Sequence, residues 1–292
     1  MTLGRADIHA LLEANDLHPS RALGQNFVAD GNTVRKIAYL AGVGPGSKVV
    51  EIGAGLGSLT RALAETGAEV TAVEIDRRIV PVLRSEVEPL GVRVVEADAL
   101  SLDWSALLDD PSSITNGTDG EARGAGWFLV ANLPYNVAVP LVVRVLEEAP
   151  QVASLLVMVQ REVGERLVAR AGDEAYGAVS VKVAYWAEAS VVGKVPASVF
   201  IPRPKVESVL IRLDRRPAPE GAAGTVPYDR LFSVVRAGFA HRRKMLRRSL
   251  DGMVEPEAYA AAGVEPTARA EELGLDAWGR LAAWPPTDPI AP

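Results

Sequence analysis

The residues best suited to chemistry in this 292-residue sequence form the run Asn132-Leu133-Pro134-Tyr135, directly after the apolar stretch 127–131. An amide, a proline and an aromatic ring stand together where a buried strand is expected to end. Ligands of open α/β sheets bind at the carboxyl ends of strands, so this run is a candidate site. It also suits a simple strand-to-helix turn with Pro134 setting the bend, and the run alone does not separate the two interpretations.

A glycine-rich stretch, Glu51-Ile52-Gly53-Ala54-Gly55-Leu56-Gly57, closes an earlier apolar run. Glycines at such a point let the backbone turn sharply and approach a ligand closely. Their spacing differs from the G-x-G-x-x-G of dinucleotide-binding proteins and disfavours NAD. A carboxylate at Glu51 repels a pyrophosphate and suits a ligand that carries positive charge.

Two further carboxylates lie near the ends of the next expected strands. Glu74 follows the glycines by about twenty residues, the place where a carboxylate accepts hydrogen bonds from ribose hydroxyls. Asp98 can accept a hydrogen bond from an adenine amino group, because an ionised carboxylate is an acceptor only. Each acid alone is more simply a solvated residue at a strand end. Together with the glycine turn they describe an adenosine pocket without phosphates.

The elements that must position these residues alternate along the chain. Strand patterns at 48–52, 69–76, 92–97, 127–131 and 154–159 are separated by helical patterns such as 59–64, 77–88 and 137–148. Such alternation predicts a parallel sheet with helices on both faces. The segment 109–126, rich in Asp, Ser, Gly and Thr, reads as a mobile surface insertion.

The C-terminal part has a different composition. Residues 216–224 form a linker rich in Pro, Ala and Gly, and only helical patterns follow, with a proline-rich tail from Trp284. We therefore expect an α/β domain over 1–215, with an N-terminal helical extension, and a helical domain over 216–292. A helix break near Gly238 is expected, because Arg242 otherwise falls on the apolar face of the helix.

Charge and composition exclude several classes of function. The chain has 48% hydrophobic and 23% charged residues, no cysteine and three scattered histidines, so we expect an ordinary globular protein with no metal site. No apolar run approaches the ~20 residues of a membrane helix and no signal peptide is recognisable, which favours the cytoplasm. The net charge of −6 argues against a nucleic-acid partner. However, the interval between Asp229 and Asp251 contains several arginines and a lysine and no acidic residue, so a locally basic face is possible.

The motifs together resemble those of class I S-adenosylmethionine-dependent adenine-N6 methyltransferases. The stretches 23–27, 200–208 and 239–247 are more narrowly similar to the ribosomal RNA adenine dimethyltransferases of the KsgA (RsmA) branch, and the likeness runs in order from about 20 to 250. It implies a Rossmann-like α/β fold, with a mostly parallel sheet and helices on both faces, plus a small C-terminal all-helical domain. It departs from the branch at Met245, where threonine is common, and at Arg248-Ser249, where Arg-Asn is common.

The resemblance also implies residue roles. Asn132 and the carbonyl of Leu133 accept the two N–H bonds of the target amine, which is a matter of positioning and electrostatics. Tyr135 stacks on the extruded base, with Phe200 as a second wall. The residues implied to contact S-adenosylmethionine are Asn26, Val28, Gly53, Gly55, Glu74, Ile75, Asp98, Ala99 and Asn132. Those implied to bind RNA are Lys205, Arg242, Arg243, Lys244, Arg247 and Arg248.

The expected function is dimethylation of the N6 amines of two adjacent adenosines near the 3′ end of 16S rRNA, in the small ribosomal subunit or its precursor. This places the chain in rRNA processing and ribosome biogenesis, as a monomer. One alternative is a large-subunit rRNA adenine methylase that confers antibiotic resistance. The other is a non-catalytic ribosome assembly or transcription factor that keeps the fold.

Overall fold

A computed structural model of the chain describes residues 2–20, 22–109, 126–217, 219, 221–241 and 243–284, without the side chain of Tyr135. The expected insertion, the proline-rich tail and Arg242 lie outside the described residues. The chain divides into two compact units. The first comprises Met1–Gly164 and Ser190–Arg215, and the second comprises Glu165–Ala189 and Arg216–Pro292.

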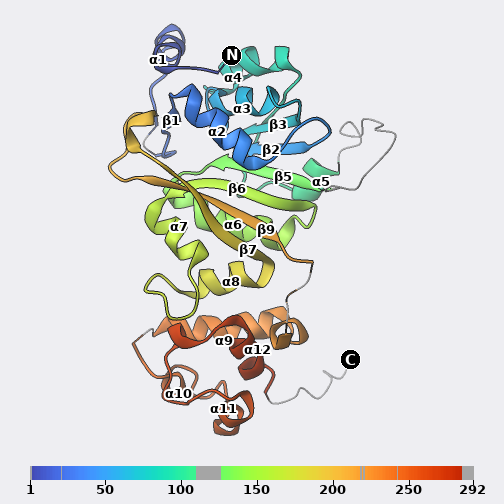
Figure 1. Cartoon of the computed structure of the whole chain (residues 1–292), viewed down its shortest axis with the longest axis vertical. Helices are drawn as coiled ribbons and strands as arrows, with labels where there is room; N and C mark the ends of the chain where they lie inside the picture. Colours follow the sequence, from blue (N-terminus) through green and yellow to red (C-terminus); the bar gives the residue numbers. More distant parts are fainter. Residues whose placement is uncertain are drawn as a thin grey trace. The chain divides into compact units, whose positions relative to one another are not determined.

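The first unit is built on a seven-stranded sheet in the order β4-β3-β2-β5-β6-β9-β7 (Figure 1). Four neighbouring pairs, β2 with β3, β3 with β4, β2 with β5 and β5 with β6, are parallel, and β9 is antiparallel to β6. The mostly parallel sheet expected from the alternation is therefore confirmed. The strands are β2 (Lys48–Ile52), β3 (Glu69–Glu74), β4 (Arg93–Glu96), β5 (Trp127–Asn132), β6 (Val152–Gln160), β7 (Ala187–Val195) and β9 (Ser208–Arg215).

Helices follow the strands as the sequence predicts. In α2 the side chain of Asp30 caps the first turn by accepting a hydrogen bond from Thr33 N, and Gly42 ends the helix with φ +69°. Together α2, α3 and α4 supply one apolar cluster against the sheet, with Val34, Leu63 and Leu83 at its centre. The helices of this unit are α1 (Arg5–Ala14), α2 (Gly31–Ala41), α3 (Ser58–Ala64), α4 (Val80–Val87), α5 (Trp104–Leu108), α6 (Tyr135–Glu148) and the first turn of α7 (Arg161–Val168), with short 3-10 turns η1 (Glu88–Leu90) and η3 (Ala197–Val199).

The register of the central strands brings the candidate residues into one row. Ile52 of β2 pairs with Val73 of β3 on one side and with Ala131 of β5 on the other. Gly53, Glu74 and Asn132 come next in their chains and therefore lie side by side at the carboxyl edge of the sheet. The strand order changes direction here, which is where open α/β sheets bind ligands.

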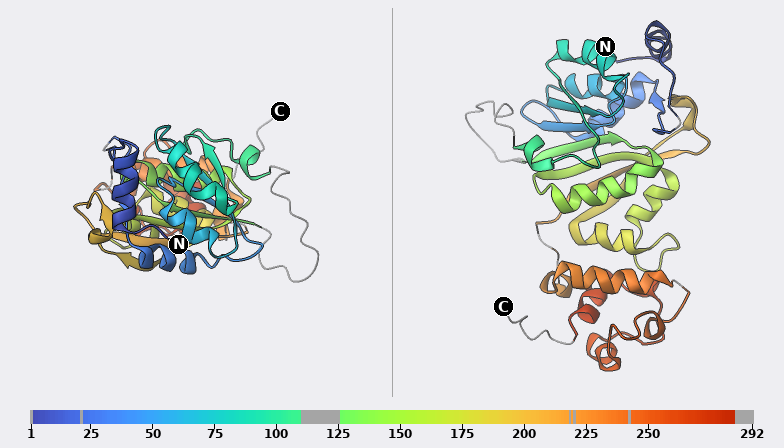
Figure 2. Two further views of the ribbon diagram at one scale, coloured as in Figure 1. Left: turned by 90° about the horizontal axis from the view of Figure 1, so that it is seen from above. Right: turned by 180° about the vertical axis from the view of Figure 1, so that it is seen from behind.

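A second, two-stranded sheet joins distant parts of the first unit. Here β1 (Phe27–Val28) pairs antiparallel with β8 (Phe200–Ile201), so that Phe27 faces Ile201 and Val28 faces Phe200. Ile8 and Leu12 of α1 are buried in the same apolar cluster as Phe27 and Ile201. The N-terminal loop and the segment around β8 are thus held together, with α1 beside them (Figure 2).

The second unit is helical and has its own core. Aromatic rings meet at its centre, where the Tyr185 and Phe232 centroids are 5.4 Å apart, and Trp278 is fully buried. Whereas the sequence suggests one division at 215, residues 165–189 group with this unit, because Tyr176, Val181 and Tyr185 belong to its core. Its helices are α8 (Ala178–Trp186), α9 (Tyr228–Ala240), α10 (Leu246–Ser249), α11 (Pro256–Ala262) and α12 (Leu275–Ala282), with η4 (Gly221–Thr225) and η5 (Ala270–Glu272).

The expected helix break near Gly238 is present but lies two to three residues further along the chain. Helix α9 runs through Gly238 to Ala240, and the chain turns only at His241. A Cβ on Gly238 would collide with the Trp278 ring, so the glycine serves close packing between helices. The apolar periodicity after Ala240 belongs to a separate short helix, α10. No helix in the described part of the chain has the length and apolar character needed to span a bilayer.

Candidate active site

A cavity of about 350 Å³ opens at the carboxyl ends of β2, β3, β5 and β6, and residues 23–28 form one of its walls. A volume of this size falls within the range of small-molecule sites. Its lining includes most of the residues singled out in the sequence. Those residues are Asn26, Val28, Glu51, Gly53, Gly55, Glu74, Ile75, Asn132, Leu133 and Phe200.

The glycine turn needs its glycines for their backbone conformation. Gly53, Gly55 and Gly57 have φ values of +73°, +57° and +86°, a region that strains residues with a Cβ. A Cβ on Gly55 would also lie 3.0 Å from the Phe27 ring. The turn therefore brings bare backbone to the cavity, where a ligand can approach it closely.

Glu74 braces this turn as well as lining the cavity. Its Oε2 accepts a hydrogen bond from Gly55 N at 2.7 Å, and its Oε1 accepts from Ile75 N and Asp76 N, both at 3.0 Å. Burial raises the pKa of the Glu74 carboxyl, and these backbone donors oppose the rise. A carboxylate has about four lone-pair sites, so one site on Oε2 remains for a ribose hydroxyl.

Glu51 lies beneath the turn, with 2% of its surface exposed. Burial raises the pKa of its carboxyl to about 8, and the neighbouring Glu74 carboxylate adds to the rise. Among the described residues, Glu51 Oε2 and the buried Ser58 Oγ find no hydrogen-bond partner. Both residues line the cavity, where their oxygens suit an ammonium group such as that of S-adenosylmethionine, and a pKa of about 8 leaves the Glu51 carboxyl largely protonated at neutral pH.

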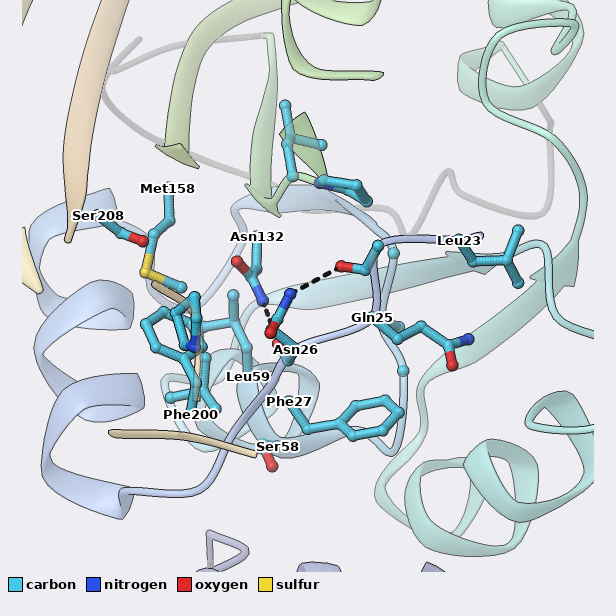
Figure 3. Close-up of a pocket in the computed structure, with 18 of the residues that line it drawn as sticks. Leu23, Gln25, Asn26, Phe27, Ser58, Leu59, Asn132, Met158, Phe200 and Ser208 are labelled. Carbon is cyan, nitrogen blue, oxygen red and sulfur yellow. Dashed lines mark hydrogen bonds between the residues drawn. The ribbon is translucent and has the colours of Figure 1, made fainter. Parts of the chain in front are cut away.

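Asn132 and Leu133 both line the cavity and offer it two hydrogen-bond acceptors. Figure 3 shows the Asn132 amide beside Asn26. Asn132 Nδ2 donates to the Asn26 carbonyl at 3.0 Å, which fixes the amide so that Oδ1 faces away from Asn26. Leu133 N donates to the Met158 carbonyl at 3.0 Å, while the Leu133 side chain is buried. Within the described part of the chain, neither Asn132 Oδ1 nor the Leu133 carbonyl receives a hydrogen bond.

The loop that holds Asn132 is itself anchored. Asn26 Nδ2 donates to the Gly24 carbonyl at 3.0 Å, and Gly24 lies so close to Pro134 that a Cβ there would be 2.8 Å from the proline ring. Gln25 accepts from Ser20 N at 2.7 Å and donates to Asp76 Oδ2 at 3.0 Å. The loop is therefore tied to the ends of both β3 and β5.

Asp76 keeps its charge in this arrangement. The Arg78 guanidinium donates two hydrogen bonds to it, and these, with the bond from Gln25, hold the pKa of the Asp76 carboxyl at about 2. Burial acts in the opposite direction but is outweighed. An ionised Asp76 is a strong acceptor for the Gln25 amide, which strengthens the link between loop and sheet.

Four predicted residues stand apart from this picture. Asp98 is exposed beyond the end of β4, where Oδ1 accepts from Leu100 N at 2.9 Å, and neither Asp98 nor Ala99 lines the cavity. Phe200 lines the cavity but is only 2% exposed, because it belongs to the apolar cluster that contains Val28. Tyr135 begins α6, and its side chain lies outside what the structure describes.

Other lining residues were missed by reading the sequence. Met158, Val159 and Gln160 end β6, the strand next to β5, so the rule that ligands bind at strand ends would have found them. Ser208 begins the antiparallel strand β9, which no local pattern reveals as a neighbour of β6. Ser58 and Leu59 are the first residues of α3, directly after the glycine turn.

The basic segment of the second unit presents its charges to solvent. Leu246 and Leu250 are fully buried, and the backbone is fixed by hydrogen bonds from Leu246 N to the Ala268 carbonyl at 2.8 Å and from Arg247 N to the Pro266 carbonyl at 3.1 Å. The exposed basic residues of this segment are Arg243, Lys244, Arg247 and Arg248. In the first unit, Lys205 is exposed as well. Searching the described residues gives no group of three or more His, Asp or Glu side chains placed to hold a metal ion.

Comparison with known proteins places this site in a family. The profile of the family described as ribosomal RNA adenine dimethylase matches residues 18–284. Proteins named ribosomal RNA small subunit methyltransferase A are similar over nearly their whole length. The one from Kineococcus radiotolerans is 44% identical, covering 97% of this chain and 92% of the relative, and that from Cutibacterium acnes is 44% identical, covering 96% and 93%.

Solved structures show the same architecture. The 23S rRNA methyltransferase ErmE superposes with a TM-score of 0.64 at 29% identity, covering 88% of this chain and 98% of its own. A dimethyladenosine transferase from Plasmodium falciparum gives a TM-score of 0.66 at 23% identity, covering 86% and 94%. At that identity the second likeness concerns the fold alone, and it agrees with the class I methyltransferase fold expected from the sequence.

Proposed function

The chain belongs to the ribosomal RNA adenine dimethylase family, and from this premise we infer that it transfers methyl groups from S-adenosylmethionine to the N6 amines of two adjacent adenosines near the 3′ end of 16S rRNA. The observation that carries the site assignment is the pair of acceptors, Asn132 Oδ1 and the Leu133 carbonyl, exposed together at a cavity lined by the glycine turn. We place the protein in the cytoplasm, acting as a monomer on the small subunit or its precursor.

The two acceptors address the main difficulty of this reaction. The lone pair of an adenine N6 amine is delocalised into the ring, so the amine is a poor nucleophile. Acceptors for both N–H bonds favour a pyramidal nitrogen, whose lone pair then points out of the ring plane. Because Asn26 holds the Asn132 amide in one orientation, this arrangement exists before the base arrives, and preorganised polar groups are the most effective kind.

S-adenosylmethionine supplies an electrophilic methyl group on a sulfonium. With the cofactor bound, this methyl group would pass from sulfur to the N6 nitrogen, and the amine would lose one proton. Neither an amide nor a peptide carbonyl takes up that proton, so Asn132 and Leu133 act by positioning the amine, and the proton passes to solvent. No strong base is needed for this step.

Other residues that line the cavity suit different parts of the cofactor. Gly53 and Gly55 offer bare backbone, and Glu74 keeps one lone-pair site for a ribose hydroxyl. Ile75 is 46% exposed, unusual for an isoleucine, and provides an apolar surface for a planar ring. Asn26 and Val28 close the opposite wall. Asp98 and Ala99 stay proposed adenine contacts that depend on the resemblance alone.

Base stacking is assigned to Tyr135, with Phe200 as a supporting wall. Extruding a base costs a few kcal/mol, and stacking on an aromatic ring returns about 1–3 kcal/mol. Because Phe200 is packed in the core, we assign it a supporting role in shaping the cavity. Tyr135 is the residue that we propose to stack on the base. Lys205 and the basic segment of the second unit are proposed phosphate contacts.

Incubation of the protein and cofactor with purified small and large subunits, followed by mass spectrometry of rRNA fragments, tests this function. Two adjacent dimethyladenosines in small-subunit rRNA are expected. Methylation of large-subunit rRNA alone would support the resistance methylase instead. Stable subunit binding with no methylation of either would support a non-catalytic assembly factor.

A further inference from the structure

A second cavity, of about 310 Å³, lies between α1 and the segment that carries η3 and β8. All of its lining belongs to the first unit, and the views in Figures 1 and 2 agree that α1 lies beside this segment. Three of the lining side chains are basic and none of the described ones is acidic. The lining residues are Arg5, His9, Ser198, Phe200, Ile201, Pro202 and Arg203.

The basic side chains come from two elements and converge on one space. Arg5 and His9 are four residues apart on α1 and therefore share a helix face. Arg203 approaches from the loop after β8. Arg5 donates from NH2 to the Ser198 carbonyl at 2.7 Å, which uses one of its five guanidinium N–H donors. The other donors and the charge remain for a ligand.

The pocket is held in shape by apolar contacts on the adjoining face of α1. Ile8 and Leu12 are buried against Ile201 and Phe27, so the helix cannot slide along the β8 segment without exposing them. The backbone of the helix that carries Arg5 and His9 is therefore held beside the segment that carries Arg203. Preorganisation of this kind lowers the entropic cost of binding.

The position of the pocket relates it to the first cavity, which Asn132 and Leu133 line. Phe200 lines both spaces, and β8 pairs with β1, which continues from Asn26. A base whose amine meets Asn132 and Leu133 would leave its ribose and phosphates outside the first cavity, and the wall around Phe200 is the one that the two spaces share. A pocket whose described lining has two guanidinium groups, an imidazole and no carboxylate suits a phosphate, which arginine binds in a bidentate manner.

We propose that the pocket formed by Arg5, His9 and Arg203 binds a backbone phosphate of the rRNA strand next to the target adenosine. The assignment rests on the proposed function, because it takes the ligand to be the strand that carries the methylated base. The pocket thereby fixes the position of the sugar-phosphate chain while Asn132 and Leu133 fix the amine.

Histidine resonances test the site directly, since the chain has only His9, His18 and His241. The full chain is titrated with a short single-stranded oligoribonucleotide containing two adjacent adenosines, with adenosine, and with inorganic phosphate. We expect the oligonucleotide to shift the His9 signals, phosphate to do so only at much higher concentration, and adenosine to leave them unchanged. An unmoved His9 in the presence of bound oligonucleotide would overturn the proposal.

Kinetics on the small subunit supply the second test. Arg203→Ala is expected to raise KM about threefold to tenfold with little change in kcat, and to flatten the dependence of log affinity on log salt by about 0.7 for the lost contact. The matched control is Arg84→Ala, which removes another exposed arginine, one on α4 that is paired with Glu88. Cofactor binding is expected to stay unchanged in both variants.

The outcomes separate this site from the proposed function. If the wild-type protein methylates the small subunit and Arg203→Ala behaves like Arg84→Ala, the phosphate site is wrong while the function stands. If inorganic phosphate shifts His9 as readily as the oligonucleotide does, the pocket is a free-anion site and the RNA assignment fails. If no rRNA is methylated by the wild type, the proposed function fails, and the oligonucleotide titration still decides whether the pocket binds RNA.

Discussion

Replacing Glu51 by glutamine tests the central electrostatic feature of the site. The carboxyl is buried, with one oxygen unpartnered among the described residues, and its pKa is raised to about 8 from the 4.5 of an unperturbed glutamate. The folded protein therefore keeps a proton that the unfolded chain releases between these two values. By linkage, the stability contributed by this proton is complete below pH 4.5 and is lost as the pH rises through 8.

The size of the effect follows from the two pKa values. Each pH unit between them lowers the free energy of unfolding by about 1.4 kcal/mol, so raising the pH from 5.5 to 7.5 costs the unliganded protein about 2.5 kcal/mol through Glu51. For a unit of this size the melting temperature should fall by roughly 5–10 °C. Glu51→Gln removes the titrating group and should abolish this part of the slope.

Calorimetry of both proteins across this range, with hydrogen exchange of the β2 amides as a local readout, measures the difference. Asp76 does not interfere, since its pKa of about 2 confines its own loss of stability to acid pH. Glu74 has a raised pKa as well and remains in both proteins. Equal slopes for wild type and Glu51→Gln between pH 5.5 and 7.5 would refute the assignment of a buried protonated carboxyl.

Substitutions at four other residues give further predictions. Asn132→Ala should lower kcat by about 10²–10³ while leaving cofactor affinity nearly unchanged. Asn132→Asp should be equally inactive, because a carboxylate cannot donate a hydrogen bond to the Asn26 carbonyl. Methyl-transfer kinetics and calorimetry of cofactor binding check both variants. Gly55→Ala should weaken cofactor binding at least tenfold, since φ is +57° and the new methyl meets the Phe27 ring, and wild-type affinity would contradict this. Lys244→Glu with Arg247→Glu should weaken rRNA binding and flatten its salt slope by about 0.7 per lost contact, as filter binding at several salt concentrations would show.

The fold was largely predictable because its signals are local and repeated. Apolar runs of strand length, each followed by a helical period, specify a parallel sheet, and the structure has those strands within a few residues of the expected bounds. The exceptions depend on distant partners. Nothing near Gly238 shows that Trp278 requires a residue without a Cβ, and nothing in 165–189 shows that its aromatic residues pack with Phe232.

The same difference between local signals and distant contacts decides how much of the site could be predicted from the sequence. Residue types at strand ends predicted that Glu51, Glu74 and Asn132 would meet, and they do. Their physical states were not predictable, because these depend on what surrounds each group in space. Burial holds Glu51 protonated where the sequence suggested a charge, and backbone donors occupy most of the Glu74 carboxylate that was expected to serve ribose.

The position of Asn132 in the sequence does not show which end of its amide faces the cavity, and the mechanism depends on that orientation. An asparagine amide has a donor end and an acceptor end, and only the acceptor end can receive an N–H of the target amine. The choice is made by the carbonyl of Asn26, more than a hundred residues earlier in the chain, which takes the donor end at 3.0 Å. That carbonyl is in turn placed by Gln25, through its bond to Asp76, and by the contact of Gly24 with Pro134. The N-terminal loop therefore acts on the reaction by deciding which atom of Asn132 faces the base. Substitutions of Gly24 or Gln25, which are not assigned to the cofactor, should therefore lower kcat before they lower cofactor affinity.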